Sequence, residues 1–576
     1  ADEPFSENII EIAFDAIVGL NDKMTANKIL MSQKKKYYTI NEPDELLKYI
    51  NDNLKPKEKE KKETGEVFTP LSLVNEMLDK LDEGYTREHG KSIFTEDEFK
   101  WLDPAVGIGN FPIIVYQRLM IGLESKIKDE EERRKHILEN MIYSSELSSK
   151  NVFIYKKIFC DDKYKLNIYE GDTLKMDVKK EFILPDDFVG FDVVMGNPPY
   201  NSNQKHDGKR GGGDSLWNKF IFKSLELLNE NKFLLFITPA GWRAPNSKHS
   251  KTKELFELMT KKNQMMYLSI HNTDDGKNTF KCGTRYDWYL IQKKIKYTMT
   301  EINDENNKIY NIDLEYWDFL PNYNFDIVSK LLKNNSESVD VIYSRNQFGT
   351  DKSWTSEIKT DKFKYPLVHS TPARGIRYYY SSTKTPSVKE LIPMFGVSKV
   401  IFGDSGINNS IIDMNGDYGL TQHSIGLGIN NLEQGKSIKK AIETIEFKDI
   451  LKSCSWSNYQ IDWKLFTYFK KDFWKEIKYK DSPKESPKDS LKGSPKGSPK
   501  DSPKKSPKKS SKESQSPKTR KEKIKLSVEK KWKEYQEREL QKSKGKGKRE
   551  TLKKKILEQS KKYTEKRTKK EDENKL

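Results

Sequence analysis

Cysteine is scarce in this chain of 576 residues. The three cysteines, Cys160, Cys282 and Cys454, lie far apart, and no Cys-x-x-Cys pair is present. This spacing supports neither a zinc site nor a disulfide framework. We therefore expect no bound metal and a reducing environment.

Long hydrophobic runs are also missing. The most apolar stretch, KFLLFITPAGW (232–242), has the length of a strand, whereas a membrane-spanning helix needs about 20 apolar residues. No secretory leader is recognisable, although the chain starts with Ala1 rather than methionine. The expectation is an intracellular protein, in the cytoplasm or the nucleus, without a membrane partner.

Positive charge is present in excess, and it is unevenly distributed. The net charge is +18, yet residues 1–480 hold 71 basic and 71 acidic residues. Residues 481–576 hold 34 Lys and Arg against 16 Asp and Glu. A neutral body with a polycationic tail indicates a polyanionic partner such as nucleic acid.

The pattern divides the chain into five segments. Residues 1–60 show helical apolar spacing, and residues 61–298 alternate short apolar strands with helices. Such alternation predicts an α/β, Rossmann-like doubly wound sheet. Residues 299–478, rich in aromatic and turn residues, predict a separate, mixed α/β domain. Residues 479–518 form a repeat linker, and residues 519–576 a basic, partly helical tail.

The linker is built on a four-residue repeat. Serine recurs at every fourth position from Ser482 to Ser510, and six of these eight serines precede proline. This composition predicts a disordered, extended and solvated segment. Its lysines can neutralise phosphates without reading sequence, although a basic spacer would look the same. The Ser-Pro pairs also invite phosphorylation, which would reduce the positive charge.

A glycine-rich turn follows the first predicted strand of residues 61–298. In WLDPAVGIGNF (101–111), Gly107 and Gly109 let the backbone approach a ligand closely, at the usual cofactor position of doubly wound sheets. A tight turn without a ligand is the alternative. No Gly-Lys-Ser/Thr follows, so this is not a P-loop. Asp103 and Pro104 argue against a dinucleotide fingerprint.

Two further acids end the next predicted strands. Glu146 closes MIYSSE (141–146) and Asp172 closes LNIYEGD (166–172). A carboxylate at the end of the second strand can accept hydrogen bonds from a ribose diol. Either acid alone can be a surface or capping carboxylate. Together with Asp103 they fit a ligand with a charged amino group, a ribose and an adenine amino group.

A fourth strand stops abruptly in VVMGNPPY (193–200). Two prolines cannot continue a central strand, because neither donates to the ladder. A stiff loop therefore begins there, with Asn197 before the prolines and Tyr200 after them.

Five segments together carry a resemblance: TGEVFTP (64–70), DPAVGIGNF (103–111), SSEL (144–147), EGD (170–172) and GNPPY (196–200). They resemble the S-adenosylmethionine-dependent adenine-N6 DNA methyltransferases of the type II restriction–modification kind. In that branch the cofactor motifs precede the recognition domain, and members also occur in large DNA viruses. The resemblance covers about residues 60–300 strongly and 300–475 weakly.

The resemblance implies S-adenosylmethionine as the cofactor. It assigns Thr69 and Pro70 to the methionine end, Asp103, Ala105, Gly107 and Gly109 to the methionine-binding turn, Glu146 to the ribose and Asp172 to the adenine amino group. It implies that residues 61–298 are the catalytic domain and residues 299–478 the target-recognition domain.

The loop GNPPY suits chemistry on an amino group. An adenine amino nitrogen is a poor nucleophile, because its lone pair is delocalised into the ring. The Asn197 side-chain oxygen and the Pro198 carbonyl can accept its two N–H groups, and Pro198 and Pro199 keep the backbone stiff. The base must leave the duplex to reach them.

Aromatic side chains are expected to hold the displaced base. Tyr200 is placed for one ring face, and Phe280 resembles the second stacking aromatic of the family. Tyr286 is a rival for that role, and a core phenylalanine is the alternative for Phe280. The basic, glycine-rich residues 201–217 are either a plain surface loop or a loop that becomes ordered around DNA.

The leading hypothesis is a site-specific DNA adenine methyltransferase, without its own nuclease, acting on double-stranded DNA. A separate cognate endonuclease is a candidate partner, and a viral source fits the Lys-, Asn- and Ile-rich composition. The alternatives are an RNA adenine or protein glutamine methyltransferase, and a catalytically inactive DNA-binding specificity protein.

Overall fold

The computed structural model describes residues 39–40, 69–200, 215–245, 251–334, 336–456 and 460–477. The predicted linker (479–518) and tail (519–576) lie outside the described residues, as do residues 64–68, the loop 201–214 and all of segment 1–60 except 39–40. The chain separates into two units, 1–482 and 483–576, and every described residue belongs to the first.

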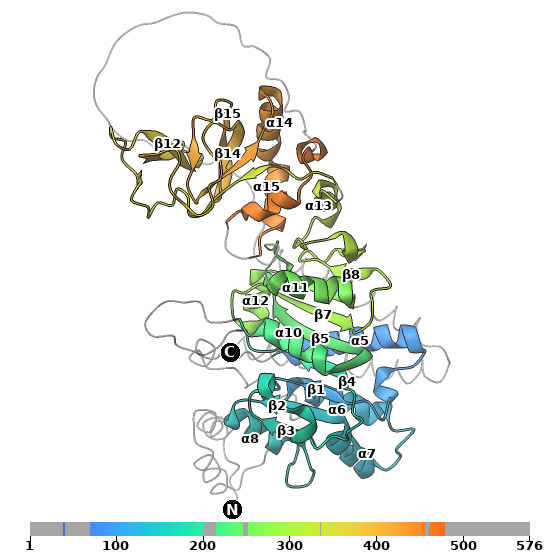
Figure 1. Ribbon diagram of the computed structural model, residues 1–576. Helices are drawn as coiled ribbons and strands as arrows, with labels where there is room; N and C mark the ends of the chain where they lie inside the picture. The colour runs from blue at the N-terminus through green and yellow to red at the C-terminus, as the bar shows by residue number, and fades with distance from the viewer. Residues whose placement is uncertain are drawn as a thin grey trace, which may run out of the picture. The chain divides into compact units, whose positions relative to one another are not determined.

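A nine-stranded mixed sheet forms the centre of the first half (Figure 1). Its strands are β1 (Trp101–Asp103), β2 (Ile142–Glu146), β3 (Asn167–Glu170), β4 (Phe191–Gly196), β5 (Leu228–Pro239), β6 (Gln264–His271), β7 (Tyr286–Gln292), β8 (Thr300–Asn303) and β9 (Ile309–Ile312). Their order is β3-β2-β1-β4-β5-β7-β6-β8-β9. Strands β1 to β5 pair in parallel, and β7 is antiparallel to both β5 and β6. The predicted α/β sheet is confirmed.

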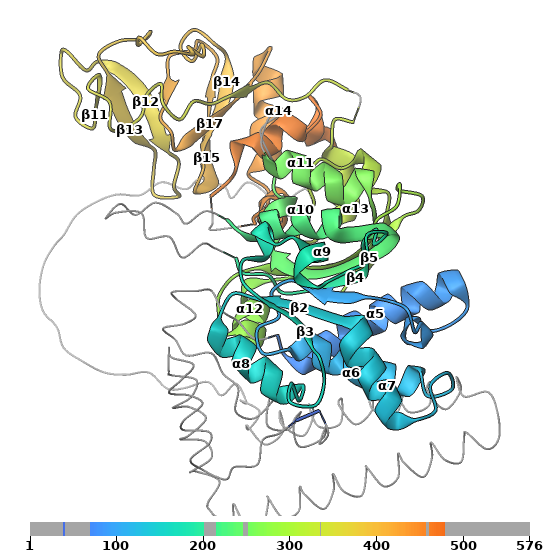
Figure 2. The ribbon, with the colours of Figure 1, turned by 60° about the horizontal axis from the view of Figure 1, so that its bottom comes forward.

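Helices cover both faces of this sheet, because its strands are apolar on both sides. Val193 and Met195 of β4 pack with α5 (Leu71–His89), α6 (Asn110–Gly122) and α8 (Ser149–Ile158). Val194, which points the opposite way, packs with α10 (Trp217–Leu227) and α11 (Lys251–Glu257). Figure 2 shows these two layers on opposite sides of the strands. Near-continuous apolar runs are typical of strands buried on both faces.

The other α-helices that the structure describes in this half are short. They are α7 (Glu130–His136), α9 (Val178–Glu181) and α12 (Thr273–Phe280). Helix α7 lies between α6 and β2, where the long spacing from Gly109 to Glu146 predicts an inserted helix at about 126–139.

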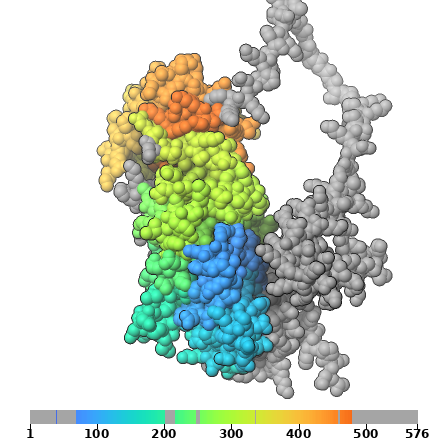
Figure 3. Space-filling view, turned by 90° about the vertical axis from the view of Figure 1, so that its right-hand side faces the viewer, coloured from blue at the N-terminus to red at the C-terminus, as the bar shows by residue number. Residues whose placement is uncertain are grey.

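Strands β8 and β9 extend the far edge of the sheet. They follow residue 298, the predicted end of the catalytic domain, and that boundary stays a prediction. Lys80 of α5 binds Glu301 of β8, with 2.8 Å between Nζ and Oε1. In Figure 3, the blue surface of α5 accordingly borders the yellow-green surface of the residues near 300.

Two four-stranded sheets follow. One has the order β10-β17-β14-β15 and the other β11-β13-β12-β16. The strands are β10 (Val341–Ile342), β11 (Thr355–Ser356), β12 (Tyr365–Ser370), β13 (Arg377–Ser381), β14 (Lys399–Gly403), β15 (Gly406–Asp413), β16 (Gly419–Leu420) and β17 (Ser424–Gly428). With α13 (Phe325–Leu331), α14 (Leu432–Ile442) and α15 (Ile445–Ser453), they make this region mixed α/β, as expected.

A fully buried arginine joins the main sheet to the chain that follows it. Arg243, just after β5, donates to both carboxylate oxygens of Asp287 on β7, at 2.7 and 3.0 Å. It also donates to the carbonyls of Leu320 and Pro321 and to Asn322 Oδ1. The side chains of Arg243 and Asp287 are both 0% exposed. Every charge in this cluster therefore has close partners, which a buried ion pair requires.

Replacing Asp287 by alanine should destabilise the fold strongly, because it leaves the Arg243 guanidinium buried without a counter-ion. We expect a loss of about 3–5 kcal/mol in the free energy of unfolding, measured by chemical denaturation. Glu357→Ala is the control, since it removes an exposed ion pair with Arg377 and should cost less than about 1 kcal/mol. Equal losses in the two variants would contradict this account.

Candidate active site

The glycine turn connects β1 to α6 and depends on left-handed backbone. Gly107 has φ 57° and Gly109 has φ 105°, a region that side chains disfavour. A Cβ atom at Gly109 would also lie 2.9 Å from the Phe159 ring and 3.0 Å from that of Tyr155. Gly109 is therefore required by its conformation and by its neighbours. The contacts are those of a close-packed turn at the start of a helix.

Glu146 holds this turn in place. The Gly107 N–H donates to Oε2 and the Ser148 N–H donates to Oε1, both at 2.8 Å. The Thr173 hydroxyl adds a further bond to the Pro104 carbonyl at 2.6 Å. The carboxylate predicted to bind a ribose is thus oriented by two backbone amides, and its role toward a ribose stays a prediction.

Asp103 is a buried carboxyl between the turn and the end of β4. It is 2% exposed and accepts from the Ala105 N–H at 3.1 Å. A Cβ atom at Gly196 would lie 2.7 Å from Asp103 Oδ1, so glycine allows this close approach. Burial raises the pKa of Asp103 to about 8, and the neighbouring Glu146 acts in the same direction. A cation or a hydrogen-bond donor next to Asp103 would stabilise its charged form.

Asp172 begins a short helical turn at Thr173–Lys175. Its Oδ1 accepts from the Leu174 N–H at 3.1 Å, and its Oδ2 lies 3.1 Å from the Lys175 ammonium. The capping alternative therefore describes its contacts in this structure. Acceptance from an adenine amino group stays a prediction.

The two ends of the Asn197 amide differ in their contacts among the described residues. Its Nδ2 donates to the Thr69 hydroxyl at 3.3 Å. Its Oδ1 is buried and has no hydrogen-bond partner among the described residues. A buried acceptor without a partner is unusual in a folded protein and calls for an explanation.

Thr69 also contacts a residue that the sequence analysis missed. The Asn110 side chain donates to the Thr69 carbonyl at 2.8 Å, and Asn110 Oδ1 is a second buried acceptor without a partner among the described residues. The only signal in the sequence was the position of Asn110, directly after Gly109. Pro70 caps α5, and its carbonyl accepts from the Leu73 and Val74 N–H groups.

The stiff loop leads into Tyr200, whose carbonyl accepts from the Leu216 N–H at 3.1 Å. The described residues on either side of positions 201–214 therefore lie next to each other. Burial raises the pKa of the Tyr200 phenol, and Cys282 and Tyr286 act in the same direction. Tyr200 is therefore neutral over the physiological range.

Phe280 lies at the end of α12 and is 3% exposed. Its ring meets Tyr286 edge to face, with 4.8 Å between centroids and an angle of 76°. Tyr286 in turn stacks on His271 at 4.4 Å. The core alternative thus describes Phe280 here, and stacking on a base stays a prediction for both Phe280 and Tyr286.

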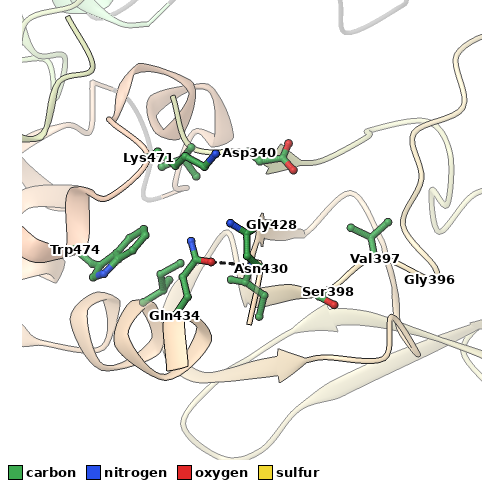
Figure 4. A pocket seen from close by; sticks show the side chains of 12 residues that line it. Asp340, Gly396, Val397, Ser398, Gly428, Asn430, Gln434, Lys471 and Trp474 are labelled. Carbon is green, nitrogen blue, oxygen red and sulfur yellow. Dashed lines mark hydrogen bonds between the residues drawn. The ribbon is translucent and has the colours of Figure 1, made fainter. Parts of the chain in front are cut away.

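A separate hollow of about 320 Å³ lies in the region after the main sheet (Figure 4). Asp340 and Lys471 line one side and Trp474 one end, while Gln434 Oε1 accepts from the Asn430 N–H at 2.7 Å. Lys471 is already paired with Glu337 at 2.9 Å. None of the predicted site residues lines this hollow.

The part of the chain that the structure describes has neither a metal-binding cluster nor a membrane-spanning helix. No group of three or more His, Cys, Asp or Glu side chains there could hold a metal ion. No helix there has the length and apolar character needed to cross a membrane.

Comparison with known proteins bears on the identity of this region. Residues 24–280 match the profile of the family described as Eco57I restriction-modification methylase. An uncharacterized adenine-specific methylase of Mycoplasma pneumoniae is 24% identical over 243 residues, covering 31% of this chain and 55% of the relative. These matches confirm the resemblance to restriction–modification methyltransferases that the motifs indicated. The chain spans about half the length of this curated relative.

Solved restriction–modification enzymes are similar at a lower level. The ATP-dependent Type ISP restriction-modification enzyme LlaBIII bound to DNA is 14% identical, with a TM-score of 0.46, over 82% of this chain and 43% of that one. The Type IIL enzyme MmeI in complex with DNA is 11% identical, with a TM-score of 0.43, over 78% of this chain and 73% of that one. At these scores, neither structure bears on the site.

The methylase-like region, residues 24–280, contains every predicted site residue except Tyr286, the rival of Phe280. Within it, the structure brings Asp103, Glu146 and the glycine turn together, and it joins Thr69 to Asn197. Asp172 lies beside them, because the Gly171 N–H donates to the Glu146 carbonyl at 2.9 Å.

The raised pKa of Asp103 predicts a pH-dependent stability. Between about pH 4 and pH 8, the folded protein keeps a proton on Asp103 that the unfolded chain has released. Wild-type stability should therefore fall as the pH rises through this window, and an Asp103→Asn variant should lack this loss. We expect the Tm of the variant minus that of the wild type to grow between about pH 5 and pH 8.5, measured by thermal unfolding without cofactor.

The same substitution at the exposed Asp326 is the control for this prediction. A difference in Tm between Asp103→Asn and wild type that stays constant with pH would show that Asp103 is charged in the folded state.

Proposed function

We propose that the protein is a site-specific DNA methyltransferase, which transfers a methyl group from S-adenosylmethionine to the N6 amino group of an adenine rotated out of the duplex. The observation that carries this proposal is the Oδ1 of Asn197, directly after β4 and before two prolines, which is buried and has no hydrogen-bond partner among the described residues. An acceptor kept free inside the protein suits a ligand that brings a donor, and an amino group is such a ligand.

The residues around the glycine turn fit S-adenosylmethionine. The buried Asp103 carboxyl lacks a cation, and the Asn110 Oδ1 lacks a donor among the described residues. S-adenosylmethionine carries an ammonium group and ribose hydroxyls, which would supply both. We assign Pro70, Asp103, Ala105, Gly107, Gly109, Glu146 and Asp172 to this site. When bound, S-adenosylmethionine supplies an electrophilic methyl group, and its sulfur keeps the electron pair of the bond that breaks.

The contribution of the chain is to orient the amino group and to favour its positive charge. Asn197 Oδ1 and the Pro198 carbonyl would accept its two N–H groups, which favours a pyramidal nitrogen with a free lone pair. Because both acceptors are held by the fold, little reorganisation is needed as positive charge develops. Tyr200, with Phe280 or Tyr286, would cover the faces of the base. In the proposal, Pro199 stiffens the loop.

DNA is favoured as the substrate by three observations. The matched family is described as a restriction-modification methylase, and the Mycoplasma pneumoniae relative is described as adenine-specific. Residues 481–576 carry the whole net charge of +18, which suits a phosphate backbone. We assign target recognition to residues 299–478, and a separate cognate endonuclease is a candidate partner.

Methyl transfer should depend on the Asn197 amide. With labelled S-adenosylmethionine, wild-type protein should label duplex DNA, and Asn197→Ala should lower the rate by about 100-fold or more, because one of two acceptors is lost. The exposed Asn140→Ala is the matched control. Binding of S-adenosylmethionine, measured by calorimetry, should survive in both variants.

The same experiment with RNA and with protein as substrates separates the alternatives. Label in RNA or in a protein glutamine, with none in DNA, would replace the proposal by one of those activities. No label in any substrate, with DNA binding retained, would indicate an inactive specificity protein.

A further inference from the structure

We propose that Thr69 is a positioning residue, whose hydroxyl holds the Asn197 amide so that Oδ1 is turned toward the reacting amino group. The inference rests on the proposed function. It gives Thr69 a task different from the contact with the methionine end of the cofactor that the motif resemblance implies.

The geometry singles out one contact. Thr69 is 4% exposed, and its Oγ1 lies 3.3 Å from Asn197 Nδ2. This is the one hydrogen bond of the Asn197 side chain within the described residues, because Oδ1 has no partner there. The two residues are 128 positions apart in the sequence, so the fold alone brings them together.

The chemistry of an amide makes this contact important. One end of the Asn197 side chain accepts hydrogen bonds and the other end only donates them. An adenine amino group also donates, so a rotation of the amide by about half a turn would set donor against donor. In the structure the Thr69 hydroxyl accepts from Nδ2, which leaves Oδ1 for the amino group and restrains rotation about the last side-chain bond. A methyl group in its place would leave the rotation about the last side-chain bond unrestrained.

Thr69 is itself anchored to the start of α6. The Asn110 side chain donates to the Thr69 carbonyl at 2.8 Å, and Asn110 directly follows Gly109 of the turn. Leu73 and Val74 of α5 are bonded to the next residue, Pro70. Thr69 therefore has a fixed backbone, and its hydroxyl can serve as a rigid support for Asn197. The support links the proposed cofactor turn to the proposed catalytic amide.

The test compares Thr69→Val with Thr69→Ser. Valine keeps the shape of threonine but lacks the hydroxyl, whereas serine keeps the hydroxyl. We expect valine to lower the single-turnover rate of methyl transfer by about 10- to 100-fold, because misplacement of a reacting group carries penalties of this size. Serine should recover most of that rate, and the Kd of S-adenosylmethionine should change by less than about threefold in both variants. Thr86→Val, at an exposed position of α5, is the control.

Two results would overturn the inference. One is a Thr69→Val protein that transfers methyl groups at the wild-type rate. The other is a loss of methyl-transfer rate that is matched, in both variants, by weaker binding of S-adenosylmethionine. That result would make Thr69 a cofactor contact.

A second measurement is independent of activity. Thr69→Val, Asn197→Ala and the double variant form a cycle of thermal stabilities without cofactor. If the hydroxyl acts on the amide, the three shifts in Tm should not be additive, because the residues share one contact. Additive shifts would contradict the inference. A wild-type protein that labels no substrate would instead contradict the proposed function, while the cycle would still decide whether Thr69 holds Asn197.

Discussion

The parallel pairing of β1 with β2 on one side and with β4 on the other is the constraint on which the candidate site depends. Trp101 aligns with both Ile142 and Val193, so the three strands run to the same edge of the sheet. Ligands of open α/β sheets bind at the carboxyl ends of such strands. Glu146 and Asp103 therefore meet at the glycine turn, and Asn197 follows the end of the neighbouring strand.

This edge is preorganised, and part of its hydrogen-bonding capacity is left unused. Backbone amides already orient Glu146, and the Ala105 N–H orients Asp103. The side-chain oxygens of Asn110 and Asn197 are nevertheless buried and unpaired among the described residues. Burying an acceptor without a partner costs stability, and such costs are typical of functional sites. The hydrogen-bond donors of the proposed cofactor and substrate would remove both costs on binding.

The region after the main sheet is attached to it through buried polar contacts. Arg243 binds Asp287 on β7 and the carbonyls at 320–321, and the Asn322 N–H donates to the Ser453 carbonyl beyond α14. Through residues 320–322, these hydrogen bonds connect the sheet to the end of α15. The residues to which we assign target recognition are thus joined to the sheet by hydrogen bonds of buried groups.

The local sequence pattern was sufficient to predict the strands of the main sheet and most residues of the candidate site. The short apolar stretches of residues 61–298 became β1 to β7, because alternate side chains of a strand meet the two helical layers. Glycines before a helix marked the turn at 107–109, and prolines after a strand marked the loop GNPPY. Tertiary structure alone decided that β7 lies antiparallel between β5 and β6, that Phe280 is buried, and that Thr69 and Asn110 meet beside Asn197. The reason is physical, because these outcomes depend on contacts between distant parts of the chain. Packing determines those contacts, and the local periodicity of apolar residues does not encode them.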